Sequence, residues 1–431
     1  MKKNVLVAIM LWCCTGPIQA DGTIYKVEYP TDTLGLQMPV TYRLWVPDTK
    51  EPLRAVIVHQ HGCGVGACQG GRTAADDLHW QALARKWNCA LLGPSYGQGE
   101  KQNCRLWCDP RNGSAKTFLK CLDDFSQQSK RPELTTIPWC LWGHSGGGFW
   151  ASIMQTLYPT RIVAIWCRSG TALPAWTKGE IPEVKLTKEV FEVPVALNPG
   201  FKERGHKQFN GAWTGAVAMM NAYRAENAPI CFCPDPVTAH ECGGSRFLAI
   251  PFFDTCLGLR LSKKAGDPSL AAIPKEGRLV EKVKIKEFSS TFQEVDDELT
   301  HPIWFPSKDF RKLWQEYVSA GWVKDNTPPA APFDVQVVTQ NGKTFLIWDA
   351  HADLESGVSH FEILQNGKVV SELKNLKAKG VAAKVFQSIS YHDTPMPDFQ
   401  RMQFPITDAS SNYSVVAVNG AGLKSPATAQ K

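Results

Sequence analysis

A glycine–serine–glycine motif carries the strongest chemical signal in this chain of 431 residues. Gly143, Ser145 and Gly147 form a G-x-S-x-G pattern between the apolar run 139–142 and an amphipathic segment that ends at Pro159. That order predicts a strand, a sharp turn and a helix, which is the context that a nucleophile elbow requires. Small residues on both sides of the serine let the strand and the helix pass close together. We therefore interpret Ser145 as a candidate nucleophile, with a serine- and glycine-rich loop as the alternative.

The segments around this motif alternate between strand and helix patterns. Apolar β-branched and aromatic runs predict strands, and segments with helical spacing predict helices. Expected strands cover 23–29, 40–46, 55–59, 89–92, 139–142, 162–166, 193–197 and 229–233, and expected helices cover 74–87, 114–127, 213–227 and 246–261. Strands that alternate with helices predict an α/β fold with a mostly parallel sheet, helices on both faces and an antiparallel edge made by the first two strands.

The elbow in this context resembles the α/β-hydrolase superfamily, and among its members the chain is similar to esterases of the acetylxylan, feruloyl and polyhydroxyalkanoate-depolymerase kind. The resemblance covers residues 21–262 and implies the chain order serine, acid, histidine, each on a loop after a strand. Glu203 is the first carboxylate after the expected strand 193–197, so the resemblance gives it the role of the acid. His240 follows the expected last strand and takes the role of the general base.

Other residues compete for these two roles. A solvated surface glutamate is the alternative interpretation of Glu203, and Asp235 is the next candidate for the acid. His301 is the competing base, although a histidine at a packing interface explains it equally. His206 follows Glu203 too closely to be its partner across two loops.

The resemblance also assigns the two amides that would bind an oxyanion. One belongs to Gly146, directly after the serine, and the other to Cys63 in the glycine-rich loop that begins at His61. We expect a disulfide between Cys63 and Cys68 to hold this loop. A pair of metal ligands is the alternative interpretation of His59 and His61, because alternate residues on a strand share one face. No Asp or Glu lies at the corresponding end of another expected strand, where it could complete such a metal site. We therefore predict neither a metal nor another cofactor.

The first twenty residues have the pattern of a cleavable export signal. Lys2 and Lys3 supply positive charge, residues 5–12 form an apolar run too short to span a bilayer, and residues 18–20 fit a cleavage site. A lipoprotein anchored at Cys13 is the alternative. We predict a secreted or periplasmic protein that does not span the membrane.

The cysteine content agrees with export. Removal of Cys13 and Cys14 with the signal would leave twelve of the fourteen cysteines, all between positions 63 and 256. In an oxidising compartment this predicts a disulfide framework, in which Cys104 and Cys108 are close enough in sequence to staple a loop. A metal site at Cys231, Cys233 and Cys242 is a weaker interpretation, because no second ligand pair follows at zinc-like spacing.

Composition limits the classes of partner. The chain is long enough for two domains, and its 43% hydrophobic residues allow a large core. Its net charge is +6, or +4 without Lys2 and Lys3, which is too weak and too dispersed to predict a nucleic-acid partner. The fifteen tryptophans are interpreted mainly as core residues, with stacking on a sugar or an aromatic ester as the alternative.

The C-terminal part of the chain reads as a separate β domain. Residues 263–326 are interpreted as an extension of the hydrolase, or else a stiff spacer, with a helix over 308–321. A proline-rich boundary at 327–332 precedes four β-type runs, at 333–339, 343–348, 360–365 and 412–418. This segment, 327–431, resembles a fibronectin type III domain with Tyr413 as the core tyrosine of the penultimate strand. Residues 376–402 are longer than that family needs, which leaves the middle strands open.

Three functions follow from these interpretations. The first is a secreted serine hydrolase that cleaves carboxylic esters through an acyl-enzyme at Ser145. Its fibronectin-like domain, by analogy with extracellular polymer-degrading enzymes, favours a polymeric or wall-associated substrate. The second is a non-catalytic binding or adhesion protein on a hydrolase scaffold, which the intact elbow disfavours. The third is a serine peptidase of the prolyl oligopeptidase kind, for which we find no propeller sequence before the hydrolase. The acyl group, the alcohol and the oligomeric state remain open.

Overall fold

The structure is a computed structural model of the chain. It describes residues 22–65, 70–264, 266–273, 279–293, 295, 297–375, 384–396 and 402–431. The expected export signal over 1–20, the alternative lipid anchor Cys13 and the expected disulfide partner Cys68 lie outside these ranges. Among the described residues, none of the helices combines the length and the apolar character that crossing a membrane requires.

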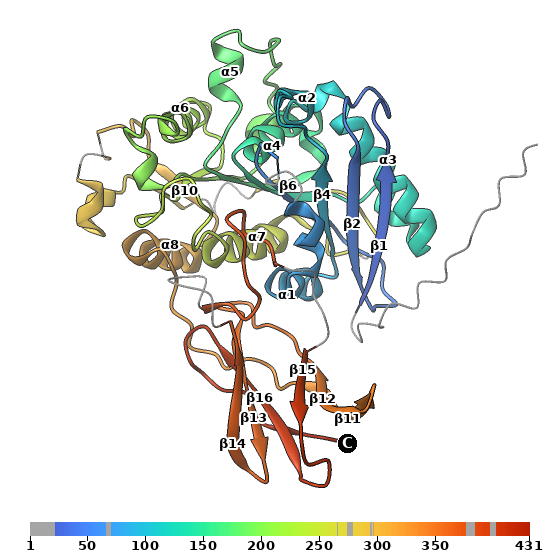
Figure 1. Ribbon diagram of the computed structural model, residues 1–431. Helices are drawn as coiled ribbons and strands as arrows, with labels where there is room; N and C mark the ends of the chain where they lie inside the picture. The colour runs from blue at the N-terminus through green and yellow to red at the C-terminus, as the bar shows by residue number, and fades with distance from the viewer. Residues whose placement is uncertain are drawn as a thin grey trace, which may run out of the picture.

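An eight-stranded sheet forms the centre of the larger domain (Figure 1). Its strands are β1 (Gly22–Tyr29), β2 (Val40–Pro47), β3 (Val56–Gln60), β4 (Ala90–Tyr96), β5 (Trp139–His144), β6 (Ile162–Arg168), β7 (Val195–Asn198) and β8 (Ile230–Phe232). They lie in the order β1-β2-β4-β3-β5-β6-β7-β8, with β1 and β2 antiparallel and β4, β3 and β5 to β8 parallel to one another. This is an α/β-hydrolase fold, and the expected antiparallel edge is confirmed.

The long helices of this domain occur close to where the sequence predicts them, whereas two short helices were not predicted. They are α1 (Leu78–Lys86), α3 (Ser114–Ser129), α4 (Gly146–Leu157), α6 (Asn210–Ala225), α7 (Arg246–Arg260) and α8 (Lys308–Ala320), with the short α2 (Arg105–Cys108) and α5 (Leu173–Thr177). The first helix starts four residues later than predicted, because Asp77 caps it: its carboxylate accepts from the amides of His79 and Trp80. α1, α7 and α8 pack in a row beneath the sheet (Figure 1).

Residues 263–326 pack on the hydrolase and are not a spacer in the described part of the chain. Two short strands, β9 (Leu279–Glu281) and β10 (Ile303–Phe305), pair antiparallel there, and α8 follows. Trp314 and Tyr317 of α8 are fully buried in the hydrolase core. Tryptophan serves mainly the core, as predicted, since eleven of the fifteen are among the fully buried side chains.

The cysteines depart most from expectation. Cys63 forms a disulfide with Cys104, so the predicted staple between Cys104 and Cys108 is wrong. The other described cysteines are free and buried, at positions 89, 108, 121, 140, 167, 231, 233, 242 and 256. Six of them lie in strands or helices and three just outside such elements, and all nine pack in the hydrophobic core, where a thiol acts as a small hydrophobic group. Burial raises the pKa of the Cys89 thiol, for example, to about 12. The extensive disulfide framework is therefore wrong for the described residues.

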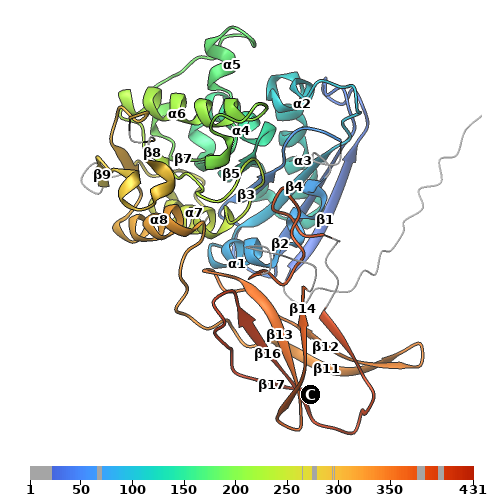
Figure 2. The ribbon, with the colours of Figure 1, turned by 60° about the vertical axis from the view of Figure 1, so that its left-hand side comes forward.

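The C-terminal region consists of two antiparallel sheets that form a second lobe below the hydrolase (Figures 1 and 2). One sheet contains β11 (Phe333–Gln340), β12 (Lys343–Asp349) and β15 (Met402–Ile406), and the other β14 (Lys368–Lys374), β13 (Val358–Gln365), β16 (Tyr413–Asn419) and β17 (Thr428–Ala429). Trp348 and Phe361, one from each sheet, meet at a centroid distance of 5.4 Å. Tyr413 is buried at the start of β16. The likeness to fibronectin type III domains and the domain boundaries remain predictions.

One segment of this lobe leaves its own sheets and enters the hydrolase. We name residues 384–396 the inserted loop; in Figure 2 the reddish segment rises from the lower lobe toward α1 and β4. Val385 of this loop belongs to the hydrophobic core of the hydrolase, and Gln387 bonds the amide of Leu78 and the carbonyl of Asp76. The excess length that the sequence shows at 376–402 includes this loop.

Candidate active site

Ser145 lies between the end of β5 and the start of α4 in a backbone conformation that non-glycine residues rarely adopt. Its φ is 53° and its ψ is −114°. The flanking glycines are required by close backbone contacts. A Cβ on Gly143 would lie 2.6 Å from the amide nitrogen of Gly148, and a Cβ on Gly147 would lie 2.6 Å from the carbonyl oxygen of His61. Close contacts thus explain both glycines of the G-x-S-x-G pattern.

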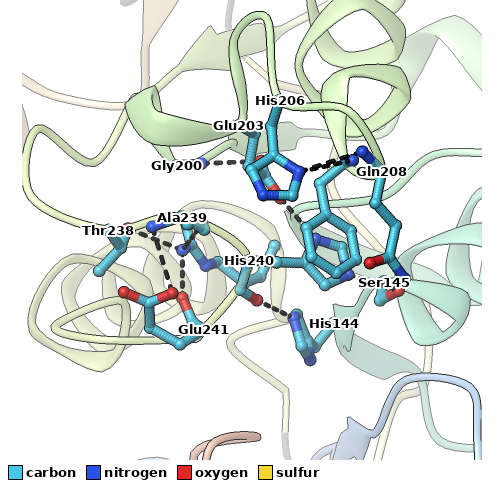
Figure 3. A network of polar contacts seen from close by, with 12 residues as sticks. His144, Ser145, Gly200, Glu203, His206, Gln208, Thr238, Ala239, His240 and Glu241 are labelled. Carbon is cyan, nitrogen blue, oxygen red and sulfur yellow. Dashed lines mark hydrogen bonds and ion pairs between the residues drawn. The ribbon is translucent and has the colours of Figure 1, made fainter.

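Ser145, His240 and Glu203 meet in one hydrogen-bonded chain (Figure 3). Nε2 of His240 is 2.9 Å from Oγ of Ser145, and its Nδ1 is 2.5 Å from Oε1 of Glu203. The other oxygen of Glu203 accepts from the amide of Gly200 at 3.0 Å, and the carboxylate is fully buried. Glu203 lies on the loop after β7 and His240 on the loop after β8. A carboxylate, an imidazole and a hydroxyl in this order form the arrangement that activates a serine for acyl transfer.

The competing residues have other partners. Asp235 accepts from the amides of Val237 and Thr238 and from the hydroxyl of Tyr317, so it fixes the turn that leads to His240. Nδ1 of His301 lies 2.9 Å from Oγ1 of the neighbouring Thr300. His206 accepts from the amides of Gln208 and Phe209 (Figure 3).

Two residues that the sequence analysis missed hold His240 in place. The ring of Phe209 stacks on the imidazole at a centroid distance of 4.1 Å with an interplanar angle of 5°. Arg168, fully buried at the end of β6, donates to the carbonyl oxygens of Ala239 and Glu241 on either side of the histidine. Burial lowers the pKa of this guanidinium, but Asp235 and Glu203 outweigh burial and raise the pKa above its usual value. No local sequence signal marks either residue.

The two expected oxyanion donors are adjacent. The amide nitrogen of Cys63 lies 3.3 Å from the position that a Cβ on Gly146 would occupy. The disulfide between Cys63 and Cys104 covers this spot, so a larger residue at Gly146 would collide with its sulfur atoms. The expected disulfide between Cys63 and Cys68 is therefore wrong, because Cys63 pairs with Cys104. Two amides beside a serine at a helix N-terminus can stabilise the negative oxygen of a tetrahedral intermediate.

A pocket of about 420 Å³ opens above Ser145 and His240. Its lining includes Phe149, Phe209 and Arg105, and the guanidinium carbon of Arg105 lies 3.8 Å from the centroid of the Phe149 ring. The pocket therefore offers apolar and cationic contacts beside the serine.

The interpretation of His59 and His61 as metal ligands finds no carboxylate to complete it among the described residues. Their rings stack at 5.5 Å, and burial lowers the pKa of His59 well below its usual value. Within the described residues, the side chains grouped closely enough to share an ion are Cys63, Cys104 and Cys108, and His360, Glu362 and Glu372. The first group contains the disulfide, and in the second the carboxylates pair with Lys424 and Lys374.

The arrangement predicts which carboxylate matters for catalysis. Glu203→Gln keeps the size of the side chain but removes the charge that orients His240, and we expect kcat for ester hydrolysis to fall roughly 10³- to 10⁴-fold. Asp235→Asn keeps an oxygen for the amides of Val237 and Thr238 and is expected to lose less than about tenfold. Steady-state kinetics on p-nitrophenyl acetate measure both. A larger loss in Asp235→Asn than in Glu203→Gln would exchange their roles.

Comparisons with solved structures give matches with low sequence identity and low TM-scores. No protein-family model and no curated protein sequence matches the chain. A poly(3-hydroxybutyrate) depolymerase from Bordetella parapertussis shares 14% identity at a TM-score of 0.38, over 56% of this chain and 88% of that one. An S-formylglutathione hydrolase from Agrobacterium tumefaciens shares 12% identity at a TM-score of 0.35, over 55% and 94%. A cold-adapted esterase from an Arctic intertidal metagenomic library shares 14% identity at a TM-score of 0.31, over 52% and 88%. At these values the fold assignment rests on the strand order of this chain and not on the similarities.

Proposed function

We propose that this protein is a secreted serine hydrolase that cleaves carboxylic esters through an acyl-enzyme. One observation carries the proposal: the hydrogen-bonded chain from Glu203 through His240 to Ser145, at a serine held in a strained backbone conformation. The strain is informative because a binding scaffold gains nothing from it, whereas a nucleophile must project from the end of a strand.

The first half of the reaction forms the acyl-enzyme. Oγ of Ser145 attacks the acyl carbon of the ester while its proton passes to Nε2 of His240, and Glu203 stabilises the imidazolium. The amides of Gly146 and Cys63 bind the oxyanion. As the carbon–oxygen bond to the alcohol breaks, the imidazolium returns the proton to the leaving oxygen.

The second half releases the acid. Water enters the pocket, loses a proton to His240 and attacks the acyl carbon, and Ser145 leaves with the proton that His240 gives back. The pocket lies at the surface beside the disulfide of Cys63 and Cys104, which suits a chain terminus or side group of a polymeric or wall-associated substrate. Export rests on the pattern of residues 1–20, and mass spectrometry of the mature N-terminus tests it.

The test is labelling of the folded full-length protein with a fluorophosphonate probe, which reacts only with an activated serine. We expect the wild type to be labelled and Ser145→Ala not to be labelled at all. Ser169→Ala is the matched control. Ser169 lines the same pocket and also has a positive φ, of 52°, but it does not take part in the hydrogen bonds that join Glu203, His240 and Ser145. Labelling of Ser169→Ala at the wild-type rate is expected. A folded wild type that resists the probe would contradict the proposal and favour the non-catalytic binding protein.

A further inference from the structure

His240 is held through its own carbonyl oxygen as well as through its ring. Three successive carbonyl groups of its loop are tied to buried side chains. Arg168 binds those of Ala239 and Glu241, and Nε2 of His144 lies 2.6 Å from the carbonyl oxygen of His240 (Figure 3). His144 is the residue directly before Ser145, so one hydrogen bond joins the nucleophile elbow to the loop of the base.

The far side of the His144 ring is occupied by the C-terminal lobe. Nδ1 of His144 lies 2.7 Å from Nδ1 of His392, which belongs to the inserted loop. The backbone next to His392 is tied as well, because the carbonyl oxygen of Tyr391 accepts from the amide of Cys242 at 3.1 Å. The C-terminal lobe thus contacts the active site, whereas the sequence analysis assigns all residues of that site to the hydrolase domain.

The two contacts of His144 determine which ring nitrogens of His144 and His392 carry a proton. A carbonyl oxygen can only accept, so the hydrogen toward His240 must be on Nε2 of His144. A neutral imidazole carries one N–H, which leaves a lone pair on Nδ1 of His144 and requires Nδ1 of His392 to be the donor. Both rings are neutral: burial, with His392 and His240 nearby, lowers the pKa of His144 well below its usual value. Burial and His240 lower that of His392 to about 4.

The inserted loop is anchored firmly enough to hold this donor in place. Asp393, the next residue, is fully buried and bonds Arg246 of α7 at 2.7 Å. Thr73 of the hydrolase donates to the carbonyl oxygen of Pro395 at 2.7 Å. Gln387, which bonds the amide of Leu78, lies before His392, and the other two bonds lie after it. The loop is therefore held to the hydrolase on both sides of His392.

We propose that His392 is a positioning residue for the general base, and that the C-terminal lobe is in this way a part of the catalytic unit. By donating to Nδ1 of His144, His392 selects the tautomer of His144 that donates to the carbonyl oxygen of His240 and so fixes Nε2 of His240 toward Ser145. Without that donor, the proton of His144 can move to Nδ1 and leave two lone pairs facing each other at the His240 carbonyl. The inference rests on the proposed function of the same triad.

The test is the rate of fluorophosphonate labelling in full-length variants, with kcat and KM for p-nitrophenyl acetate beside it. His392→Leu removes the donor at similar volume, and we expect labelling and kcat to fall about tenfold with KM changed less than about twofold. His392→Asn replaces Nδ1–H with an amide N–H at the same place and is expected to recover to within about threefold of wild type. Met396→Ala is the control, since this residue of the same loop is 57% exposed.

A double-mutant cycle separates positioning from a general effect on folding. His144→Gln places an amide N–H toward the carbonyl of His240 without needing a tautomer. In that background His392→Leu is therefore expected to cost less than about twofold. His392→Phe, which keeps a ring beside Tyr391, replaces the leucine variant if that variant shows no thermal unfolding transition.

The outcomes distinguish the two proposals. A folded wild type that the probe does not label refutes the proposed function, and this inference with it. A labelled wild type with equal rates in His392→Leu refutes the positioning role alone. The same conclusion follows if Asn fails to rescue, or if His392→Leu costs as much in the His144→Gln background as in the wild type.

Discussion

His240→Ala is expected to lower kcat for p-nitrophenyl acetate by about 10⁴- to 10⁶-fold. The substitution removes the atom that lies 2.9 Å from Oγ of Ser145, so no group remains to take the hydroxyl proton during attack or to return it to the leaving alcohol. The apolar and cationic contacts that Phe149 and Arg105 offer in the pocket remain in this variant, so KM is expected to change little. Steady-state kinetics with enzyme concentrations high enough to detect the residual rate measure the effect.

His301→Ala is the matched control for this prediction. The sequence offers His301 as the competing base, but its Nδ1 lies 2.9 Å from Thr300, and we expect its loss to change kcat less than about twofold. Thermal unfolding of both variants shows whether each is folded. A strong loss in His301→Ala with activity retained in His240→Ala would overturn the assignment of the base.

The fold was predictable because its signals are local. Each strand of the parallel sheet is a short apolar run, and the helices between them have helical spacing, so periodicity alone orders the elements. The elbow is equally local, since steric contacts at Gly143 and Gly147 leave glycine as the residue that fits and therefore mark the motif in the sequence.

The partners of the site were harder to predict, because they depend on contacts between distant segments. Cys63 pairs with Cys104, 41 residues away, and not with the nearby Cys68 that sequence spacing favours. Arg168 belongs to an apolar strand, where nothing in the sequence shows that it will bind the carbonyls around His240. His392 is separated from His144 by 248 positions and lies in another lobe. Such contacts follow from how the loops close in space, which periodicity does not describe.

The buried cysteines also show that spatial contacts cannot be predicted from positions in the sequence. An even number of cysteines in an exported chain predicts disulfide pairing. Nine of the described cysteines are instead free and belong to the hydrophobic core. Spacing in the sequence cannot separate a thiol that packs as a small apolar group from one that faces a partner.

Arg246→Met is expected to lower the free energy of unfolding by about 3–5 kcal/mol, the largest stability effect we predict for a single substitution. Arg246 is 1% exposed and lies between two buried carboxylates: it binds Asp77 at 2.6 Å and Asp393 at 2.7 Å. Asp77 also caps α1, and Asp393 belongs to the inserted loop, so the guanidinium joins two helices of the hydrolase to the C-terminal lobe. Methionine fills the volume but leaves both charges buried without a cation.

The pH dependence of this defect has a definite sign. Burial raises the pKa of Asp393 to about 6 although Arg246 lowers it, so removal of Arg246 moves that pKa further up. A carboxyl group whose pKa is higher in the folded state than in the unfolded state binds more protons when folded, so stability is lost as the pH rises through the folded-state value. Urea unfolding should therefore show a larger defect for Arg246→Met at pH 8 than at pH 5.

Neutralising the two carboxylates provides the control that separates charge from packing. In Arg246→Met combined with Asp77→Asn and Asp393→Asn no buried charge is left at this cluster, and the amide oxygen that replaces the Asp77 carboxylate can still cap α1. Most of the lost stability is therefore expected to return at pH 8. Thr73 and Gln387 still connect the inserted loop to the hydrolase in the triple variant, so fluorophosphonate labelling is expected to recover with stability. A defect in Arg246→Met that neither low pH nor the two asparagines relieve would show that the arginine acts through packing of its alkyl chain instead.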